Sequence, residues 1–414
     1  MPSHNLAIVL LAALVGCGGG SGQMTGDDVD ASTSSDSAPA DAVASSTCEP
    51  GTSVCATGCC AWSGETIGTG VRWHAGLRVA GDRVHAAYLE MTSTATGTTY
   101  KVKHAVRGAP AWTLDDAAYA ASQNTANPRY ALRGIALALD ASGAPQIGYL
   151  RDEIYQVGTR NVQFLVAERT SSAFSSTKIV EFQNTYGSGL AEPLSLDVDG
   201  SGRLHASVAS CCTASQYLNR VRYGVRSAAG IWSIEDVAQL QVEGAVLAVS
   251  PNGMPQIISM TQGEAIDHNT TPGAWQTTEI ARDIASQPYV HARAAAIALS
   301  TTGEPHVCYQ SKTNHLMYTT RSGGTWSSVE VDAAPETGEH CAIALDSAGR
   351  PLICYRDGVA SDLKCASVYA GQWTTATVVS AGDVGQGVEV AFDGGDRAHV
   401  IYFDATQTMW KYLH

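Results

Sequence analysis

The chain has 414 residues, of which 44% are hydrophobic and only 15% charged, so it can build a folded core and is not a disordered protein. Its 39 acidic against 25 basic side chains give a formal net charge of −14, which argues against nucleic acid as a partner because phosphate binding needs clustered Lys and Arg. The sequence contains no run of 18 or more apolar residues that could span a bilayer.

Residues 1–16 have the pattern of a signal peptide. An apolar run from Leu6 to Val15 is too short for a membrane helix and has the length of a secretory h-region, although no Lys or Arg precedes it. The run ends in Leu-Val-Gly-Cys17, which resembles the lipobox of bacterial lipoproteins, where the cysteine is acylated. The resemblance implies a lipid anchor such as palmitate on Cys17. With Gly18 after the cysteine, it also implies a location in the outer membrane, facing the periplasm or the cell surface.

Two short segments separate this signal from the main body of the chain. Residues 17–47 consist mostly of Gly, Ser, Ala, Thr and Asp and are expected to form a flexible acidic tether. Residues 48–60 hold four cysteines in a C-x6-C-x3-C-C pattern, which lacks the paired C-x2-C knuckles of a zinc site. The stretch from Asp197 to Gly202 imitates a calcium loop, but its twelfth position is Val208 rather than Glu. We therefore expect no metal and no cofactor.

Residues 61–414 contain seven copies of one phrase. An apolar alternating run, a turn with Asp or Gly, and a second alternating run follow one another, as in IALALDASGAPQIGY and AAIALSTTGEPHVCY. Alternation with a period of two predicts strands, and the glycine-containing turn predicts a β-hairpin. The second run usually starts at a His or Gln, which we call the anchor. The anchor positions are His85, Gln146, His205, Gln256, His306, Leu352 and His399. Their spacing of 46 to 61 residues is that of a four-stranded propeller blade.

A second phrase, an aromatic residue before a β-rich run, predicts how the ring closes. It follows six of the hairpins, at Trp112, Phe174, Trp232, Trp275, Trp326 and Trp373. The last hairpin lacks it, but a seventh copy stands before the first hairpin at Trp62. An N-terminal outer strand that completes the C-terminal blade removes an exposed sheet edge. The sequence therefore predicts an all-β fold, a seven-bladed β-propeller over residues 61–414, and we expect it to be a monomer.

This arrangement resembles bacterial propeller lipoproteins related to the sialidase-like Asp-box group. An Asp-box reads S-x-D-x-G-x-T-W, and the nearest match here is TTRSGGTW, with Arg321 in place of the Asp. No arginine segment and no Tyr–Glu pair of a sialidase is recognisable. The resemblance implies the propeller fold without the catalytic residues of that group, and we predict no catalytic residue.

The starting ends of the innermost strands are the candidate binding site, because these strands line the channel of a propeller. Counting back 13 residues from each anchor gives a polar or charged position in every repeat: Arg72, Arg133, Glu192, Glu243, Arg293, Glu339 and Gln386. His291 and His340 lie beside this ring. Residues at the ends of the second strands would enlarge it: Glu90, Asp152, Arg356, Asp357 and Asp404. We interpret the ring as a site for a sugar or an acidic group; the alternative is a ring of ion pairs between blades that binds only water.

The remaining repeated residues are expected to be structural. Anchors that recur in six blades suit hydrogen bonds between neighbouring strands, and the aromatic residues suit packing between blades. Ten cysteines follow Cys17, and an even number in an exported chain favours disulfides. Cys354 should face Cys365 across a hairpin, and Cys308 and Cys341 lie on adjacent blades.

The sequence thus predicts a lipid-anchored envelope protein that binds glycans or a protein partner without catalysis. One alternative is a glycan-active hydrolase or lyase, whose acid and base would come from the same ring, and another is a purely structural envelope protein. Two carboxyl groups about 5 to 9 Å apart in an open pocket would favour the enzyme. Carboxylates engaged by arginines would oppose it.

Overall fold

The computed structural model describes residues 52–55, 58–71, 75–108, 111–155, 160–170, 172–184, 194–210, 220–239, 242–261, 266–284 and 295–414. All of them belong to a compact unit formed by residues 46–414. Cys17, the expected signal peptide and the expected tether lie outside the described residues. Within this part of the chain, no helix is long and apolar enough to cross a membrane.

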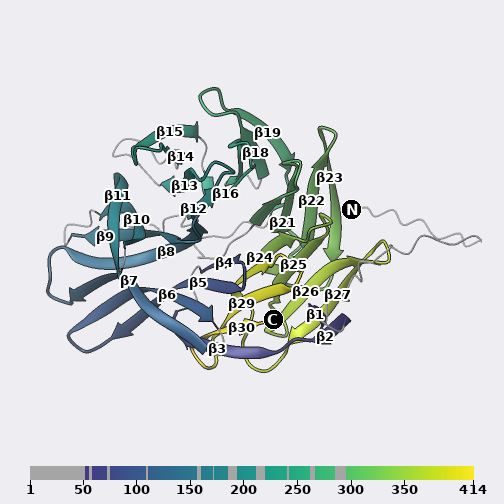
Figure 1. Cartoon of the computed structure of the whole chain (residues 1–414), viewed down its shortest axis with the longest axis horizontal. Coiled ribbons are helices and arrows are strands. Elements are labelled where there is room, and N and C mark those ends of the chain that lie inside the picture. Colours follow the sequence, from purple (N-terminus) through teal and green to yellow (C-terminus); the bar gives the residue numbers. More distant parts are fainter. Residues whose placement is uncertain are drawn as a thin grey trace, which may run out of the picture. The chain divides into compact units, whose positions relative to one another are not determined.

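The described strands form a seven-bladed β-propeller, as the repeats predict (Figure 1). Blade 1 contains β4 (Gly76–Ala80), β5 (Arg83–Ser93), β6 (Gly97–Gly108) and β7 (Ala111–Gln123). Blade 2 contains β8 (Arg129–Leu139), β9 (Pro145–Ile154), β10 (Arg160–Thr170) and β11 (Ala173–Asn184). Blade 3 contains β12 (Leu194–Val198), β13 (Leu204–Ser210), β14 (Arg220–Arg226) and β15 (Trp232–Gln239).

The next three blades repeat the same order of four antiparallel strands. Blade 4 contains β16 (Val242–Val249), β17 (Pro255–Thr261), β18 (Ile266–Thr270) and β19 (Gln276–Ala281). Blade 5 contains β20 (Ala295–Leu299), β21 (Pro305–Gln310), β22 (Leu316–Ser322) and β23 (Thr325–Asp332). Blade 6 contains β24 (Thr337–Leu345), β25 (Pro351–Asp357), β26 (Asp362–Tyr369) and β27 (Gln372–Val379). The first strands of all seven blades contact one another in a closed cycle.

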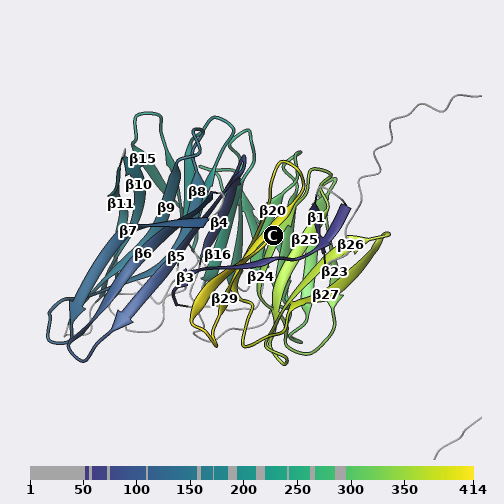
Figure 2. The same cartoon turned by 60° about the horizontal axis from the view of Figure 1, so that its bottom comes forward.

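Blade 7 joins the two ends of the propeller and confirms the predicted closure. Its first three strands are β28 (Gln386–Phe392), β29 (Ala398–Asp404) and β30 (Met409–Leu413). Its outer strand is β3 (Gly64–Thr69), which pairs antiparallel with β30. Figure 2 shows β3 running past the C-terminus. Backbone hydrogen bonds of 3.0 and 3.1 Å between Ser63 and His414 extend this pairing. A short hairpin of β1 (Thr52–Cys55) and β2 (Gly58–Ala61) precedes it.

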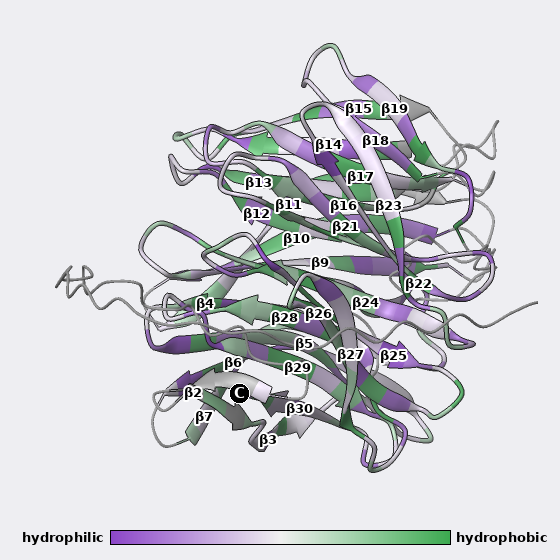
Figure 3. Cartoon of the chain, turned by 90° about the vertical axis from the view of Figure 1, so that its right-hand side faces the viewer, coloured by the Kyte–Doolittle hydropathy of each residue, from purple (hydrophilic) through white to green (hydrophobic). Residues whose placement is uncertain are grey.

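The burial of each strand follows from its place in the blade. Second strands such as β29 are buried along their whole length because both of their faces pack against neighbouring blades. Outer strands such as β23 are largely exposed. Hydrophobic and hydrophilic residues are mixed along many of the strands (Figure 3).

Aromatic side chains of the outer strands pack against the preceding blade, as expected. Trp112 of blade 1 meets Tyr412 of blade 7 edge-on, with ring centroids 5.2 Å apart. Trp275 meets Tyr223 of blade 3 in the same way at 5.4 Å. The ring atoms of Trp373 lie in a tilted contact with Tyr318 of blade 5 at 5.0 Å. These contacts repeat around the propeller and bury the seam between blades.

The anchors hold the same tyrosines from the inner side, which confirms their expected role. His205, His306 and His399 each place Nδ1 2.6 Å from a tyrosine hydroxyl on the third strand of their own blade. In blade 1 the partner of His85 is His104, at 3.2 Å. An anchor, a third-strand side chain and the aromatic residue of the next blade thus form one connected row.

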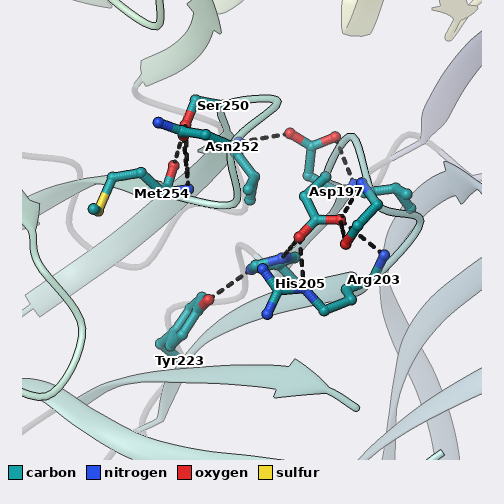
Figure 4. Close-up of polar contacts among 11 residues, drawn as sticks. Asp197, Arg203, His205, Tyr223, Ser250, Asn252 and Met254 are labelled. Atoms are coloured by element: carbon teal, nitrogen blue, oxygen red, sulfur yellow. Dashed lines mark hydrogen bonds and ion pairs between the residues drawn. The ribbon is translucent and has the colours of Figure 1, made fainter. Parts of the chain in front are cut away.

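The turns between first and second strands hold their own carboxylates. Asp199 Oδ1 accepts hydrogen bonds from the backbone N–H groups of Ser201 and Arg203, each at 2.9 Å. Its Oδ2 lies 2.7 Å from Arg203 Nε and 3.2 Å from His205 Nε2. Figure 4 shows Arg203 and His205 of this turn, with Tyr223 beside His205. Gly202 has φ of +81°, a conformation that favours glycine. The calcium-like stretch is therefore an ordinary hairpin turn, and the described residues contain no metal-binding group of three or more His, Cys, Asp or Glu.

Both expected disulfides are present. Cys354 of β25 and Cys365 of β26 face each other directly in the strand register, and Cys308 of β21 is bonded to Cys341 of β24 in the next blade. The second bond joins blades 5 and 6 covalently. Cys59, in β2, is also disulfide-bonded.

Candidate functional site

The central channel passes between the first strands of the seven blades. The first strands of all seven blades line a cavity of about 90 Å³, with Ala, Leu, Ile and Val as the main lining residues. Arg78, Ser195 and Glu389 are its polar side chains.

One end of the propeller collects the predicted ring. Because neighbouring strands are antiparallel, first and third strands begin there, and second and fourth strands end there. We call this end the mouth face and the opposite end the turn face. Arg133, Glu339 and Gln386 lie near the beginning of β8, β24 and β28 on the mouth face. Glu243 lies in β16, but its side chain is outside the described part. Arg72, Glu192, Arg293 and His291 are also outside the described residues.

A β-bulge follows the ring position in the blades where it is described. The register shifts after Arg133, at Glu339 and after Gln386. The next residue has positive φ in each blade: +56° at Gly134, +55° at His340 and +60° at Gly387. Glycine adopts this conformation at no steric cost, whereas another residue is strained. His340 therefore stands where two other blades use glycine, and strain of this kind often marks a functional position.

In blade 2 the ring residue belongs to a buried ion pair. Arg133 Nε lies 2.7 Å from Asp152 Oδ2, and Nη2 donates to Oδ1 at 2.9 Å. The two side chains are 6% and 2% exposed, and Arg160 Nε approaches the same carboxylate at 3.6 Å. Asp152 lies on the neighbouring strand β9 of the same blade. This contact therefore joins two strands of one blade, because the antiparallel second strand places Asp152 beside Arg133.

In blades 6 and 7 the ring residues join a more open cluster of Glu339, His340, Arg356, Asp383 and Gln386, which we call the blade 6–7 cluster. Arg356, near the end of β25, places Nη2 2.7 Å from Asp383 Oδ1, in the loop that leads into blade 7. Its Nη1 lies 4.0 Å from Glu339 Oε2. His340 Nε2 lies 3.7 Å from Glu339 Oε1. The amide of Gln386 donates to both carboxylate oxygens of Asp383, at 3.2 and 3.3 Å.

The cluster combines buried donors with accessible carboxylates. The side chain of Arg356 is 10% exposed, whereas those of Glu339 and Asp383 are 31% and 43% exposed. Arg356 Nη2 also donates to Ser361 Oγ at 3.1 Å. Arg356 thus binds the carboxylate of Asp383, in the loop that leads into the next blade, and Asp383 was not among the predicted site residues. Asp383 lies three residues before the ring position Gln386, and a search of the sequence for carboxylates at this spacing could have identified it.

A second ion pair occupies the mouth face between blades 5 and 6. Asp332 Oδ2 accepts hydrogen bonds from Tyr355 Oη at 2.6 Å and from Lys364 Nζ at 2.5 Å. Burial opposes ionisation of Asp332, but hydrogen bonds from Lys364, Tyr355 and the backbone N–H of Ala334, together with the charge of Lys364, lower the pKa of the carboxyl. Asp332 is therefore held ionised and cannot serve as a general acid near neutral pH.

One carboxyl on the mouth side has the opposite shift. Asp267 is the second residue of β18, the third strand of blade 4, and burial together with the nearby charge of Glu279 raises its pKa. A raised carboxyl pKa is a property of the general acid in glycosidases. Asp267 lies on β18, a third strand, and is not one of the predicted ring positions.

Comparisons with known proteins identify the fold only. No family model and no characterised protein sequence matches this chain. Among solved structures, the BP39L lectin of Burkholderia pseudomallei is similar with a TM-score of 0.54 and 12% identity, over 82% of this chain and 94% of that one. AofleA of Arthrobotrys oligospora has a TM-score of 0.45 and 10% identity over 78% and 90% of the two chains. The NanB sialidase of Streptococcus pneumoniae, as its K499G mutant, has 0.44 and 12% over 82% and 67%.

Proposed function

We propose that this protein is a non-catalytic binding protein of the cell envelope, anchored by a lipid on Cys17 in the outer membrane, and that its mouth face binds glycans or a protein partner. The observation that carries the proposal is the ion pair between Arg356 and Asp383. A carboxylate bound to an arginine is a poor acid or base but a well-placed hydrogen-bond acceptor. BP39L, which has the same fold, is named a lectin, so the fold is compatible with glycan binding.

The binding test uses purified full-length protein in detergent on a glycan array, with a hydrolysis screen of the same glycans beside it. We expect binding without turnover, and we expect Asp383→Ala to weaken it. Turnover would contradict the non-catalytic assignment. No signal in either assay would leave a protein partner or a structural role.

The hydrolase alternative has one specific observation in its favour, the raised pKa of Asp267. If turnover is found, Asp267→Asn tests whether this carboxyl is the acid, because the amide cannot donate a proton. If Asp267→Asn leaves turnover intact, the acid lies elsewhere on the mouth face.

The anchor is tested separately by labelling cells with palmitate. We expect label on the wild-type protein and none on Cys17→Ser. Label on the variant would contradict the lipid attachment at this residue.

A further inference from the structure

The accessible polar atoms of the blade 6–7 cluster are hydrogen-bond acceptors. The carboxylates of Glu339 and Asp383 are the most exposed of its charged groups. The main donor, Arg356, is 10% exposed and directs Nη2 to Asp383 and Ser361. A ligand at this place therefore meets acceptors and has to supply the donors itself.

Gln386 adds an acceptor that has no partner. The residue is 5% exposed, and its amide nitrogen donates to Asp383, so the amide lies within the cluster. Its Oε1 is buried and has no hydrogen-bond partner among the residues that the structure describes. Leaving a buried carbonyl oxygen unpaired costs about 1–3 kcal/mol, and a donor from a ligand would remove that cost.

The surrounding charge selects the kind of donor. In the fully described stretch 332–414, seven carboxylates lie at the mouth face: Asp332, Glu336, Glu339, Asp357, Asp362, Asp383 and Asp404. The basic residues there are Arg356, Lys364 and Lys411; the first two are in ion pairs, and Lys411 Nζ donates to Thr66 and Gln407. Seven acidic against three basic groups leave about −4 at this end of two blades. A field of this sign attracts cations and repels acidic ligands.

A metal ion does not fit the cluster. No group of three or more His, Cys, Asp or Glu side chains in the described part of the chain is placed to hold one. An organic cation with several N–H donors matches the acceptors better.

The backbone conformation of His340 supports the assignment of a binding site to the blade 6–7 cluster. At φ of +55° it occupies a strained conformation that blades 2 and 7 assign to glycine. Its ring is 13% exposed and lies beside the carboxylate of Glu339. A flat side chain at this point supplies a wall next to the acceptors, which glycine would not.

We propose that the blade 6–7 cluster binds the primary ammonium group of an amino sugar, in which Glu339, Asp383 and Gln386 Oε1 accept its hydrogen bonds. This inference rests on the proposed binding function and specifies its ligand. It separates the site from one for acidic sugars, which would need free arginine forks.

The test measures binding of three oligosaccharides to full-length protein in detergent by titration calorimetry at low and at moderate salt. The probes are a glucosamine tetramer, an N-acetylglucosamine tetramer with the same skeleton, and a tetragalacturonate. We expect the glucosamine tetramer to bind at least tenfold more tightly than the other two, and its affinity to fall with salt. If an acetylated or acidic tetramer binds equally well or better, the inference is wrong while the binding function stands. If neither these probes nor the glycan array gives binding, the inference and the glycan-binding function are both wrong, and a protein partner or a structural role is left.

Substitutions in the blade 6–7 cluster test which residues bind the ligand. We expect Asp383→Asn and Glu339→Gln each to weaken glucosamine binding by about tenfold, the loss typical of one charged hydrogen bond. His340→Gly should also weaken it but keep or raise the melting temperature, because glycine relieves the strained backbone. Asp82→Asn, an exposed residue in a hairpin turn of the turn face, makes the same charge change and should have no effect. Unchanged affinity in Glu339→Gln and His340→Gly would overturn the assignment even if Asp383→Asn does not fold.

Discussion

The buried ion pair of blade 2 should be essential for stability and unimportant for binding. The side chains of Arg133 and Asp152 are 6% and 2% exposed, and two short contacts join their charged groups. Asp152→Ala would leave the guanidinium of Arg133 buried without this carboxylate, with Arg160 close by. Breaking a buried pair from one side costs about 3–5 kcal/mol, so we expect a loss of that size in the free energy of unfolding.

The chain offers a matched control for this prediction. Arg169 and Asp115 form an ion pair of 2.5 Å between blades 2 and 1, but their side chains are 31% and 46% exposed. Asp115→Ala should cost about 1 kcal/mol or less, because water screens an exposed pair. The measurement is the midpoint of urea unfolding for both variants.

A double variant separates pairing from packing. Arg133→Met with Asp152→Leu removes both charges and should recover much of the stability lost in Asp152→Ala. If Asp152→Ala is as mild as Asp115→Ala, the pair is not structural and the interpretation of Arg133 fails. If the double variant folds but no longer binds oligosaccharides, Arg133 takes part in ligand binding.

Three further predictions concern stability. Burial lowers the pKa of His268 from 6.5 to about 4. The stability that its neutral form contributes is therefore complete above pH 6.5 and is lost as the pH falls toward 4. In His268→Gln the melting temperature should depend less on pH over this window, and an unchanged slope would contradict the burial argument. Hydrogen bonds from Arg107 hold the pKa of Glu65 below 4.5, so the contribution of ionised Glu65 to folding stability is present above pH 4.5 and is lost on further acidification. Glu65→Gln should reduce the acid sensitivity of unfolding below that pH. At neutral pH it should cost about 1 kcal/mol or less, because both side chains of the ion pair are 30% exposed. Replacing Cys354 and Cys365 together with alanine should cost about 3 kcal/mol in urea unfolding, and a reductant should then have less effect on the variant than on the wild type.

Local patterns in the sequence were sufficient to predict the fold. Strand alternation, hairpin turns and the displaced aromatic phrase at Trp62 predicted seven blades and their closure by an N-terminal strand, and the structure has both. The pairing of Cys354 with Cys365 was predictable because a hairpin register depends on residues close in the chain. Each of these features repeats or spans a short stretch, so the chain itself carries its signal.

The tertiary structure decided the roles of the polar ring residues. Arg133 and Glu339 occupy equivalent positions in their blades, yet one is sealed in an ion pair with Asp152 and the other lies partly exposed beside His340. Asp383 became part of the site because the loop into blade 7 brings it to Arg356 across the seam between two blades. The sequence determines where strands begin and end through local alternation, but the partner of a charged side chain depends on distances between segments far apart in the chain, which only the closed ring establishes.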